Sequence, residues 1–294
     1  MEGSRLHYRA FAKLNLFLQV LGKREDGYHE IRSLMVTVGL ADTLQLRRTP
    51  SEIDLHCKSA DVPLGPDNLC WKAASSLREY GGCSSGVEIT LTKSIPVAAG
   101  LGGGSSDAAC TLVGLNRLWE LGLGHEELME VAAGIGSDVS FFVKGGAQLA
   151  EGRGEKLTPL ESLPELWFVI LSPPLKVSSR QAYSAVKIGL TRVEHRNRME
   201  GLGMGLDAAN VAGSLQNDLE SGVMEFCPEV RELKSALLSH GALGSLMSGS
   251  GPAVFGIARD QTSASAIASE IGRPGLSAFV ARTVAEASIE LDRD

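Results

Sequence analysis

Residues 96–107 read Pro-Val-Ala-Ala-Gly-Leu-Gly-Gly-Gly-Ser-Ser-Asp and have the features of a loop that binds phosphate. Glycines let a main chain approach a ligand closely, and the helix expected after them would offer an anion unpaired N–H groups and about half a positive charge. The loop lacks the Gly-Lys-Ser/Thr ending of a Walker A loop, and Ser105 stands where a dinucleotide fingerprint begun at Gly100 needs its third glycine. The alternative is a glycine-rich turn without a ligand, which three consecutive glycines before two serines disfavour.

Lys13 and Asp138 are a candidate pair of opposite charges. Apolar residues alternate over 12–21, which predicts a strand whose opposite face presents Lys13 and Asn15 to a substrate. Asp138 is expected in the first turn of a short helix capped by Ser137, where apolar neighbours disfavour its charge unless a cation such as Lys13 compensates. The alternatives are an exposed lysine at a sheet edge and an acid held only by the helix dipole.

A turn between two strands carries a third group of candidate residues. Asp26 and Gly27 form a turn signal, so Tyr28 and His29 should begin a return strand that runs to about residue 38. An aromatic ring and an imidazole at a hairpin tip could form a binding edge. An ordinary surface histidine is the alternative, because no metal-ligand partner is spaced near it.

The first half of the chain should supply the strands and helices that hold these residues. Asp67 should cap a helix whose inner stripe runs from Leu69 to Tyr80, with Asn68 in its first turn. A second helix should follow the glycines, and a third should occupy residues 125–133. The caps considered for the second helix are Ser105, Ser106 and Asp107, and further strands are expected over residues 42–48, 52–57 and 87–92.

The second half has the element order of a ferredoxin-like layer, strand-helix-strand-strand-helix-strand with an extra helix inserted. A polar Gly/Pro stretch over 152–159 is interpreted as a boundary, which divides the chain into domains 1–155 and 156–294. Residues 191–210 are expected to form a surface loop. The expected strands are 166–171, 243–247, 253–258 and 278–284, and the expected helices begin at Ser178 or Ser179, Pro228 and Asp260.

Composition limits the classes of function. The chain has 294 residues, 44% of them hydrophobic, and a net charge of −7 with a pI near 5.5, so an electrostatic footprint for nucleic acid is not expected. Five cysteines without C-x-x-C spacing favour neither a disulfide framework nor a zinc site and fit a reducing cytoplasm. No apolar run approaches the ~18 residues of a membrane span, and no signal segment is recognised at the start.

Three segments together resemble the GHMP family of small-molecule kinases. They are Ala-Lys-Leu-Asn-Leu over 12–16, the glycine-rich segment extended to 109, and Ser-Gly-Ser-Gly-Pro-Ala-Val-Phe over 248–255. The resemblance covers nearly the whole chain. It implies an α+β protein with the GHMP kinase fold, in which an S5-domain-2-like α/β sandwich precedes a ferredoxin-like C-terminal domain.

What the resemblance implies for the site is specific. ATP with Mg²⁺ would be the phosphate donor, although the metal ligands cannot be identified, and Lys13 and Asp138 match the family's catalytic pair. The implied nucleotide-binding residues are Asn68, Lys93, Pro96, Val97, Ala98, Ala99, Gly100, Leu101, Gly102, Gly103, Gly104, Ser105 and Ser106. The implied acceptor-binding residues are Asn15, Tyr28, His29, Ser179 and Tyr183.

Within the family, segments 24–31, 136–142 and 216–220 are most similar to members whose acceptor is the 2-hydroxyl of a cytidine-diphosphate-linked methylerythritol. This similarity implies that the partner is a small molecule and not a nucleic acid or a membrane. It also implies that the protein is a monomer or a homodimer. The alternatives are a kinase for homoserine, mevalonate or galactose, a sensor that binds a sugar or nucleotide without turnover, and a nucleic-acid-binding module. Only 5% aromatic residues and the acidic charge disfavour the last.

Overall fold

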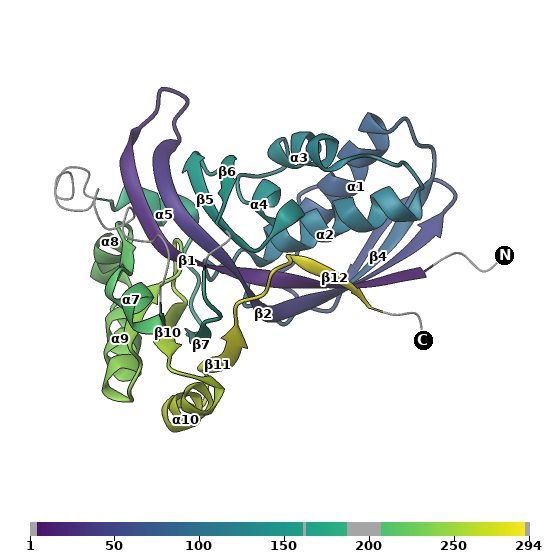
Figure 1. Ribbon diagram of the computed structural model, residues 1–294. Helices are drawn as coiled ribbons and strands as arrows, with labels where there is room; N and C mark the ends of the chain where they lie inside the picture. The colour runs from purple at the N-terminus through teal and green to yellow at the C-terminus, as the bar shows by residue number, and fades with distance from the viewer. Residues whose placement is uncertain (1–4, 161–162, 187–206, 292–294) are drawn as a thin grey trace.

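A long bent hairpin runs through the molecule and joins its parts (Figure 1). The computed structural model describes residues 5–160, 163–186 and 207–291, and the hairpin is formed by β1 (Arg5–Lys23) and β2 (His29–Thr49). The strands expected over 28–38 and 42–48 are one continuous strand. The pairing of β1 with β2 shifts register at three points, and such irregularities let a strand pair bend from one layer into another.

The first sheet has the strand order β12-β1-β2-β4-β3; β5 also pairs with β2, β6 pairs with β5, and β8 lies beside β1. Strands β3 (Ile53–Cys57) and β4 (Gly86–Thr92) confirm the sequence predictions. Four short strands were missed because brief polar segments carry little periodicity: β5 (Ala147–Gly152), β6 (Lys156–Pro159), β8 (Gln216–Asn217) and β12 (Ser288–Leu291). The division at residues 155 and 156 stays a prediction, and β6, β8 and β12 cross it to join the first sheet.

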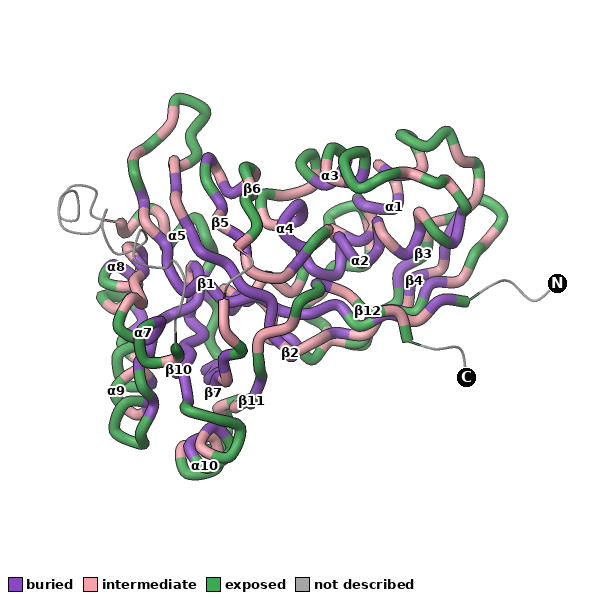
Figure 2. Tube along the Cα trace, viewed as in Figure 1, coloured by how far each residue is buried: buried purple, intermediate pink, exposed green. Residues whose placement is uncertain are grey.

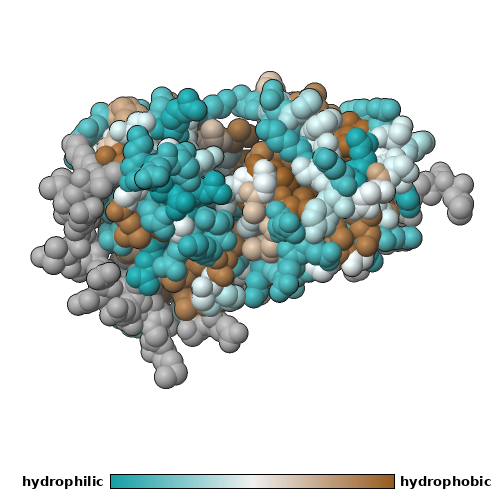
Figure 3. All heavy atoms as spheres, turned by 90° about the horizontal axis from the view of Figure 1, so that it is seen from above, coloured by the Kyte–Doolittle hydropathy of each residue, from teal (hydrophilic) through white to brown (hydrophobic). Residues whose placement is uncertain are grey.

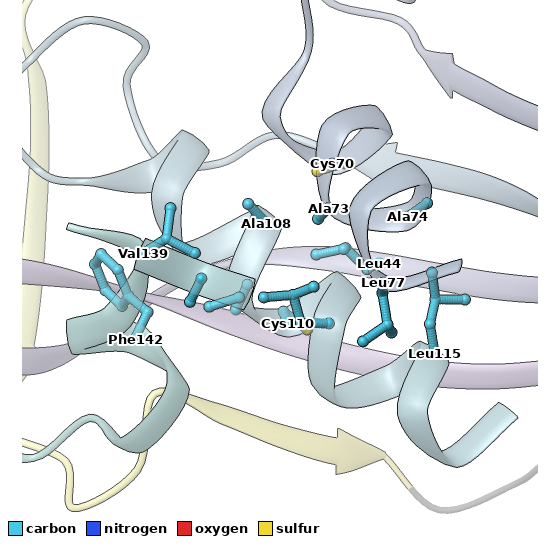
Figure 4. Close-up of a cluster of buried hydrophobic side chains, with 14 of the residues drawn as sticks. Leu44, Cys70, Ala73, Ala74, Leu77, Ala108, Cys110, Leu115, Val139 and Phe142 are labelled. Atoms are coloured by element: carbon cyan, nitrogen blue, oxygen red, sulfur yellow. The ribbon is translucent and has the colours of Figure 1, made fainter. Parts of the chain in front are cut away.

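Four helices cover one face of this sheet (Figure 1): α1 (Leu69–Tyr80), α2 (Gly103–Leu118), α3 (His125–Ala133) and α4 (Val139–Lys144). Figure 4 shows how their apolar side chains meet, with Leu77 of α1 and Leu115 of α2 near Leu44 of β2. Val139 and Phe142 of α4 lie at the other end of this cluster, beyond Ala108 and Cys110 of α2. The apolar stripe predicted for α2 is therefore confirmed.

Three predicted helix starts are wrong in detail. Asn68, not Asp67, caps α1, because its Oδ1 accepts a hydrogen bond from Cys70 N at 2.7 Å, and Tyr80 at the end of the helix is exposed. Helix α2 has no side-chain cap: it begins directly after Gly102, whose φ of 72° favours glycine. Asp138 occupies the N-cap position of α4 instead of its first turn.

The second sheet has the order β11-β7-β10-β9, and all its pairs are antiparallel. Its strands are β7 (Trp167–Ser172), β9 (Gly244–Met247), β10 (Val254–Ala258) and β11 (Ser277–Arg282). With α9 (Glu229–Ser239) and α10 (Gln261–Ile271) as the crossings, this is the predicted ferredoxin-like layer. The accessory helices are α5 (Ser179–Ser184), α7 (Ala208–Gly213) and α8 (Glu220–Phe226). Most of the loop predicted over 191–210 lies outside the described residues.

Strand β1 contributes to all three hydrophobic cores, and the tube in Figure 2 is accordingly buried along its centre. Tyr8 packs against α2, Leu14 belongs to the core shared with the second sheet, and Leu18 packs in the core that includes α8 and α9. The middle of β1 is therefore the point where the parts of the molecule meet.

All five cysteines are free thiols. Within residues 5–160, 163–186 and 207–291, no helix has both the length and the apolar character needed to cross a membrane.

Candidate active site

A cavity of about 1240 Å³ opens where β1, the glycine-rich loop, α4, α5 and the β9–β10 connection meet. Seen from above in Figure 3, hydrophobic residues lie between hydrophilic ones on this face of the molecule. Every residue predicted to be catalytic, nucleotide-binding or acceptor-binding lines the cavity, with the exception of Ser106. Its volume exceeds the roughly 300–1,000 Å³ of ordinary ligand pockets and leaves room for two ligands side by side.

Three parts of the chain hold the glycine-rich loop. Asp42 of β2 accepts hydrogen bonds from Ser94 N and Ile95 N at the loop's entrance. Strand β1 binds its middle and its exit, since Lys13 N donates to Leu101 O at 3.0 Å and Ser106 Oγ donates to Phe11 O. Ser106 thus uses its hydroxyl proton within the fold, and its role in nucleotide binding stays a prediction.

The third attachment comes from the β9–β10 connection, residues 248–253. Ser248 Oγ donates to Gly100 O at 3.0 Å, and Ala253 N donates to Ala99 O at 3.2 Å. A Cβ on Gly100 would lie 2.1 Å from Ser248 O, and φ at this residue is 78°, so only glycine fits here. The helical hydrogen bonds of α2 begin with Ser106 N to Gly102 O, so the preceding N–H groups of Gly103, Gly104 and Ser105 are the ones available to an anion.

The ammonium of Lys13 is almost fully buried beside this loop. Its Nζ donates to Asn15 Oδ1, Asn15 Nδ2 donates to Ser33 Oγ at 2.8 Å, and Ser33 Oγ donates to Phe17 O. The two side chains share one face of β1 as predicted, but that face is covered, so the alternative of an exposed edge lysine is wrong. In this structure Asn15 orients Lys13, and acceptor binding by Asn15 stays a prediction.

Lys13 and Asp138 come together although 125 residues (138 − 13) separate them in the sequence. Lys13 Nζ lies 3.8 Å from Asp138 Oδ2, and the Asp138 side chain is 35% exposed while that of Lys13 is 5% exposed. Burial lowers the pKa of Lys13, and the Asp138 carboxylate opposes part of that shift. Asp138 makes no cap hydrogen bond, so its carboxylate is directed at the cavity and not committed to α4.

Lys93, expected near the nucleotide, is already paired with two acids. Its Nζ donates to Asp42 Oδ2 and, at 2.7 Å, to Asp107 Oδ2. Burial raises the pKa of Asp107, the neighbouring Asp42 adds to this rise, and the Lys93 ammonium opposes it. The Oδ1 atom of Asp107 is buried without a hydrogen-bond partner. Because residues 93 and 107 flank the glycine-rich loop, this ion cluster closes the loop at its base. A contact between Lys93 and nucleotide stays a prediction.

The side of the cavity where acceptor binding is predicted is lined by aromatic rings. His29 and Tyr183 stack with their centroids 5.0 Å apart, and Arg153 lies over the ring of Tyr28 with its guanidinium carbon 5.0 Å from the centroid. Burial lowers the pKa of His29, and Lys23 adds to this shift. Ser179 Oγ approaches Ser250 Oγ at 3.4 Å, which joins the start of α5 to the β9–β10 connection. These rings could enclose a planar group.

Sequence reasoning missed four residues that shape the site: Ser33, Asp42, Arg153 and Asn217. Only Asn217 stood in a segment that the sequence had connected with function. The others act through contacts with residues far away in the chain, which no local pattern reveals. Among the described residues there is also no cluster of three or more side chains suited to hold a metal ion.

Two family descriptions match the sequence: GHMP kinases N terminal domain over residues 68–146, and GHMP kinases C terminal over residues 195–275. A protein of Pelotomaculum thermopropionicum named 4-diphosphocytidyl-2-C-methyl-D-erythritol kinase is 46% identical over 277 residues, which cover 93% of this chain and 96% of that protein.

Solved structures show the same relationship. A crystal structure of 4-(cytidine 5'-diphospho)-2C-methyl-D-erythritol kinase superposes with a TM-score of 0.75 at 36% identity and covers 94% of this chain and 98% of that one. A homoserine kinase from Cytophaga hutchinsonii has a TM-score of 0.78 at 21% identity, covers 98% of this chain and 97% of that one, and shows the shared fold.

Replacing Lys93 tests whether its ion cluster is structural. Lys93→Met should lower the free energy of unfolding by about 3–5 kcal/mol, because it leaves the buried carboxylates of Asp42 and Asp107 without their cation. Urea unfolding followed by circular dichroism measures this. Adding Asp107→Asn should recover part of the loss by removing one of the two stranded charges.

The matched control is Lys72→Met, which removes an exposed lysine from the surface of α1. If the two lysine variants lose equal stability, Lys93 is not the structural cation that the geometry indicates.

Proposed function

The chain belongs to the GHMP kinase family, and from this premise we propose that it uses ATP to phosphorylate the 2-hydroxyl of 4-diphosphocytidyl-2-C-methyl-D-erythritol, giving the 2-phosphate and ADP. This reaction belongs to the non-mevalonate route to isoprenoid precursors. The observation that carries the proposal is the meeting of Lys13 and Asp138 in one cavity beside the glycine-rich loop.

The nucleotide side of the cavity supplies main-chain donors. The phosphates of ATP would lie on the N–H groups of Gly103, Gly104 and Ser105, where the dipole of α2 favours negative charge. Phosphoryl transfer needs mainly positioning and charge stabilisation, both of which a fixed loop provides. Asn68 and Lys93 line the same side and would contact the nucleotide from the outside of the loop.

The acceptor alcohol would lie between the charged pair and the aromatic side chains. Asp138 is placed to accept the hydroxyl proton, and Lys13 to stabilise the oxygen as negative charge develops on it. The stacked rings of His29 and Tyr183, together with Tyr28, provide flat apolar surface for cytosine, while Asn15 and Ser179 offer polar contacts nearby.

Mg²⁺ belongs to the proposal as the companion of ATP. Asp107 Oδ1 is a buried carboxylate oxygen without a partner at the edge of the cavity, which is the type of ligand that the ion prefers. Since Mg²⁺ is held by phosphates and water as much as by protein, one carboxylate here fits its needs. The ion would neutralise negative charge on the phosphates.

We further propose a cytoplasmic enzyme, monomeric or homodimeric, whose partner is this small molecule and not a nucleic acid or a membrane. The net charge of −7 disfavours a nucleic-acid partner, because most of the protein surface would repel a polyanion of that size.

The direct test incubates purified protein with Mg-ATP and the proposed acceptor and follows phosphorus NMR. We expect a new phosphomonoester signal together with ADP. Homoserine, mevalonate and galactose serve as competing acceptors in parallel. Faster transfer to one of these would replace the proposed acceptor, and ATP binding without transfer to any would indicate a sensor.

Asp138→Asn tests the proposed base. The substitution keeps the size of the side chain but removes the proton acceptor, so kcat should fall about 10²–10⁴-fold while the Kd for ATP stays within about threefold. A coupled assay for ADP and titration calorimetry measure the two quantities. Asp67→Asn, which changes another acid of the same cavity, should retain most activity. Near-normal turnover in Asp138→Asn would remove Asp138 from this role.

The lowered pKa of Lys13 predicts a pH dependence. Because the protonated form is lost at a lower pH than in an ordinary lysine, kcat should decline on the alkaline side with a midpoint below about 10.4. Lys13→Arg should be less active but should lack this decline, because a guanidinium stays charged. Rate profiles between about pH 6 and pH 10 measure this, and an identical alkaline limb in Lys13→Arg would assign the titration to another group.

A further inference from the structure

Residues 216–220, Gln-Asn-Asp-Leu-Glu, connect β1 with the end of β9, although the proposed chemistry gives them no role. Strand β8 pairs with β1 in parallel, with Gln216 opposite Phe17 and Asn217 opposite Leu18. Asp218 N donates to Leu18 O, and the side-chain Oδ2 of Asp218 accepts from Val20 N at 2.9 Å. The segment is therefore fixed to β1 a few residues beyond Lys13 and Asn15.

The same segment holds the β9–β10 connection from its other side. Asn217 Nδ2 donates to Met247 O at 2.9 Å and to Gly249 O at 2.8 Å, and Asn217 Oδ1 accepts from Leu219 N. Glu220 Oε1 accepts from Met247 N at 2.8 Å. Asn217 is 8% exposed and uses both its donors, so it is the group that fixes the position of Gly249.

Gly249 forms a wall of the Lys13 pocket. A Cβ at this position would lie 2.9 Å from Lys13 Nζ, 3.1 Å from Asn15 Oδ1 and 3.1 Å from Gly100 O. The main chain therefore lies directly against the ammonium, its hydrogen-bond acceptor and the glycine-rich loop. Its φ of 53° also favours glycine. Any shift of this wall would give the ammonium room to move.

We propose that Asn217 is a positioning residue for Lys13, acting through the wall at Gly249. The contacts form a closed ring, from Lys13 along β1 to Leu18, across to Asn217, on to Gly249 and back to the ammonium. Displacements of about 1 Å at a reacting group can cost up to 10²-fold in rate, so a ring of this kind bears on turnover. The inference rests on the proposed kinase reaction, because it concerns the group that acts in it.

The test compares Asn217→Ala, which changes the last residue of β8, with Asp218→Ala, which changes the residue directly after it. Asn217→Ala removes the hydrogen bonds from Asn217 Nδ2 to Met247 O and Gly249 O. Asp218→Ala removes the acceptor for Val20 N and Gln216 Nε2 and leaves the contacts of residues 247–249 intact. Both should lower the unfolding temperature. We expect kcat of Asn217→Ala to fall about tenfold or more below that of Asp218→Ala, with a smaller change in the KM for ATP. A smaller difference in kcat, or a loss confined to KM, overturns the proposal.

A second variant covers the case in which Asn217→Ala does not fold. Gly249→Ala breaks no hydrogen bond but places a methyl group against the ammonium, so it should lower kcat about tenfold or more. Unchanged kcat in Gly249→Ala overturns the proposal.

A readout without the acceptor separates this inference from the proposed function. NMR titration of the Lys13 ε-carbon, assigned by its loss in Lys13→Met, should show a higher pKa in Asn217→Ala than in the native protein, because water would reach a group whose pKa burial lowers. The charged group that faces Lys13 is Asp138, which both variants retain. Absence of turnover in the native protein would reject the proposed function, whereas an unchanged Lys13 titration would reject the role of Asn217.

Discussion

A buried ammonium is the constraint on which the rest of the site depends. Lys13 is 4% exposed, and removing a charge from water is costly unless hydrogen bonds and an opposite charge compensate. Compensation here is partial: Asn15 accepts one hydrogen bond, and the carboxylate of Asp138 is 3.8 Å away. An incompletely satisfied cation in a cavity attracts anions strongly, and this explains why the surrounding main chain must hold it so firmly.

That support comes from parts of the chain that are far apart in sequence. The glycine-rich loop is attached to β2 by Asp42, to β1 by Lys13 N and Ser106, and to the second sheet by Ser248 and Ala253. Neither sheet alone could shape the loop, because strands of the first sheet hold its two ends and Leu101, whereas the β9–β10 connection holds Ala99 and Gly100. The site therefore lies where the long hairpin passes from the helices to the second sheet.

The sequence predicted what depends on local patterns. Alternation identified β4 and the shared face of Lys13 and Asn15, helical spacing identified the stripe of α2, and the composition of residues 96–107 identified the loop. It could not predict contacts between distant segments. Asp42 neutralises Lys93 across 51 residues, and Asn217 reaches Gly249 across 32, and neither pairing leaves a periodic signal. The same reason explains why Lys93, expected to lie near the nucleotide, was not recognised as part of a buried ion cluster.

The distribution of charge explains how an acidic chain could hold polyanionic ligands. With a net charge of −7, the overall field opposes them, and Lys93 is paired with two acids. Main-chain N–H groups at the start of α2 carry no counter-ion and lose no side-chain freedom when they bind, so they attract phosphate without changing the overall charge. These N–H groups can bind phosphate only if they point into the cavity, and the hydrogen bonds that attach the loop fix that direction. The geometry of the main chain, more than the number of cations, thus determines what this cavity can bind.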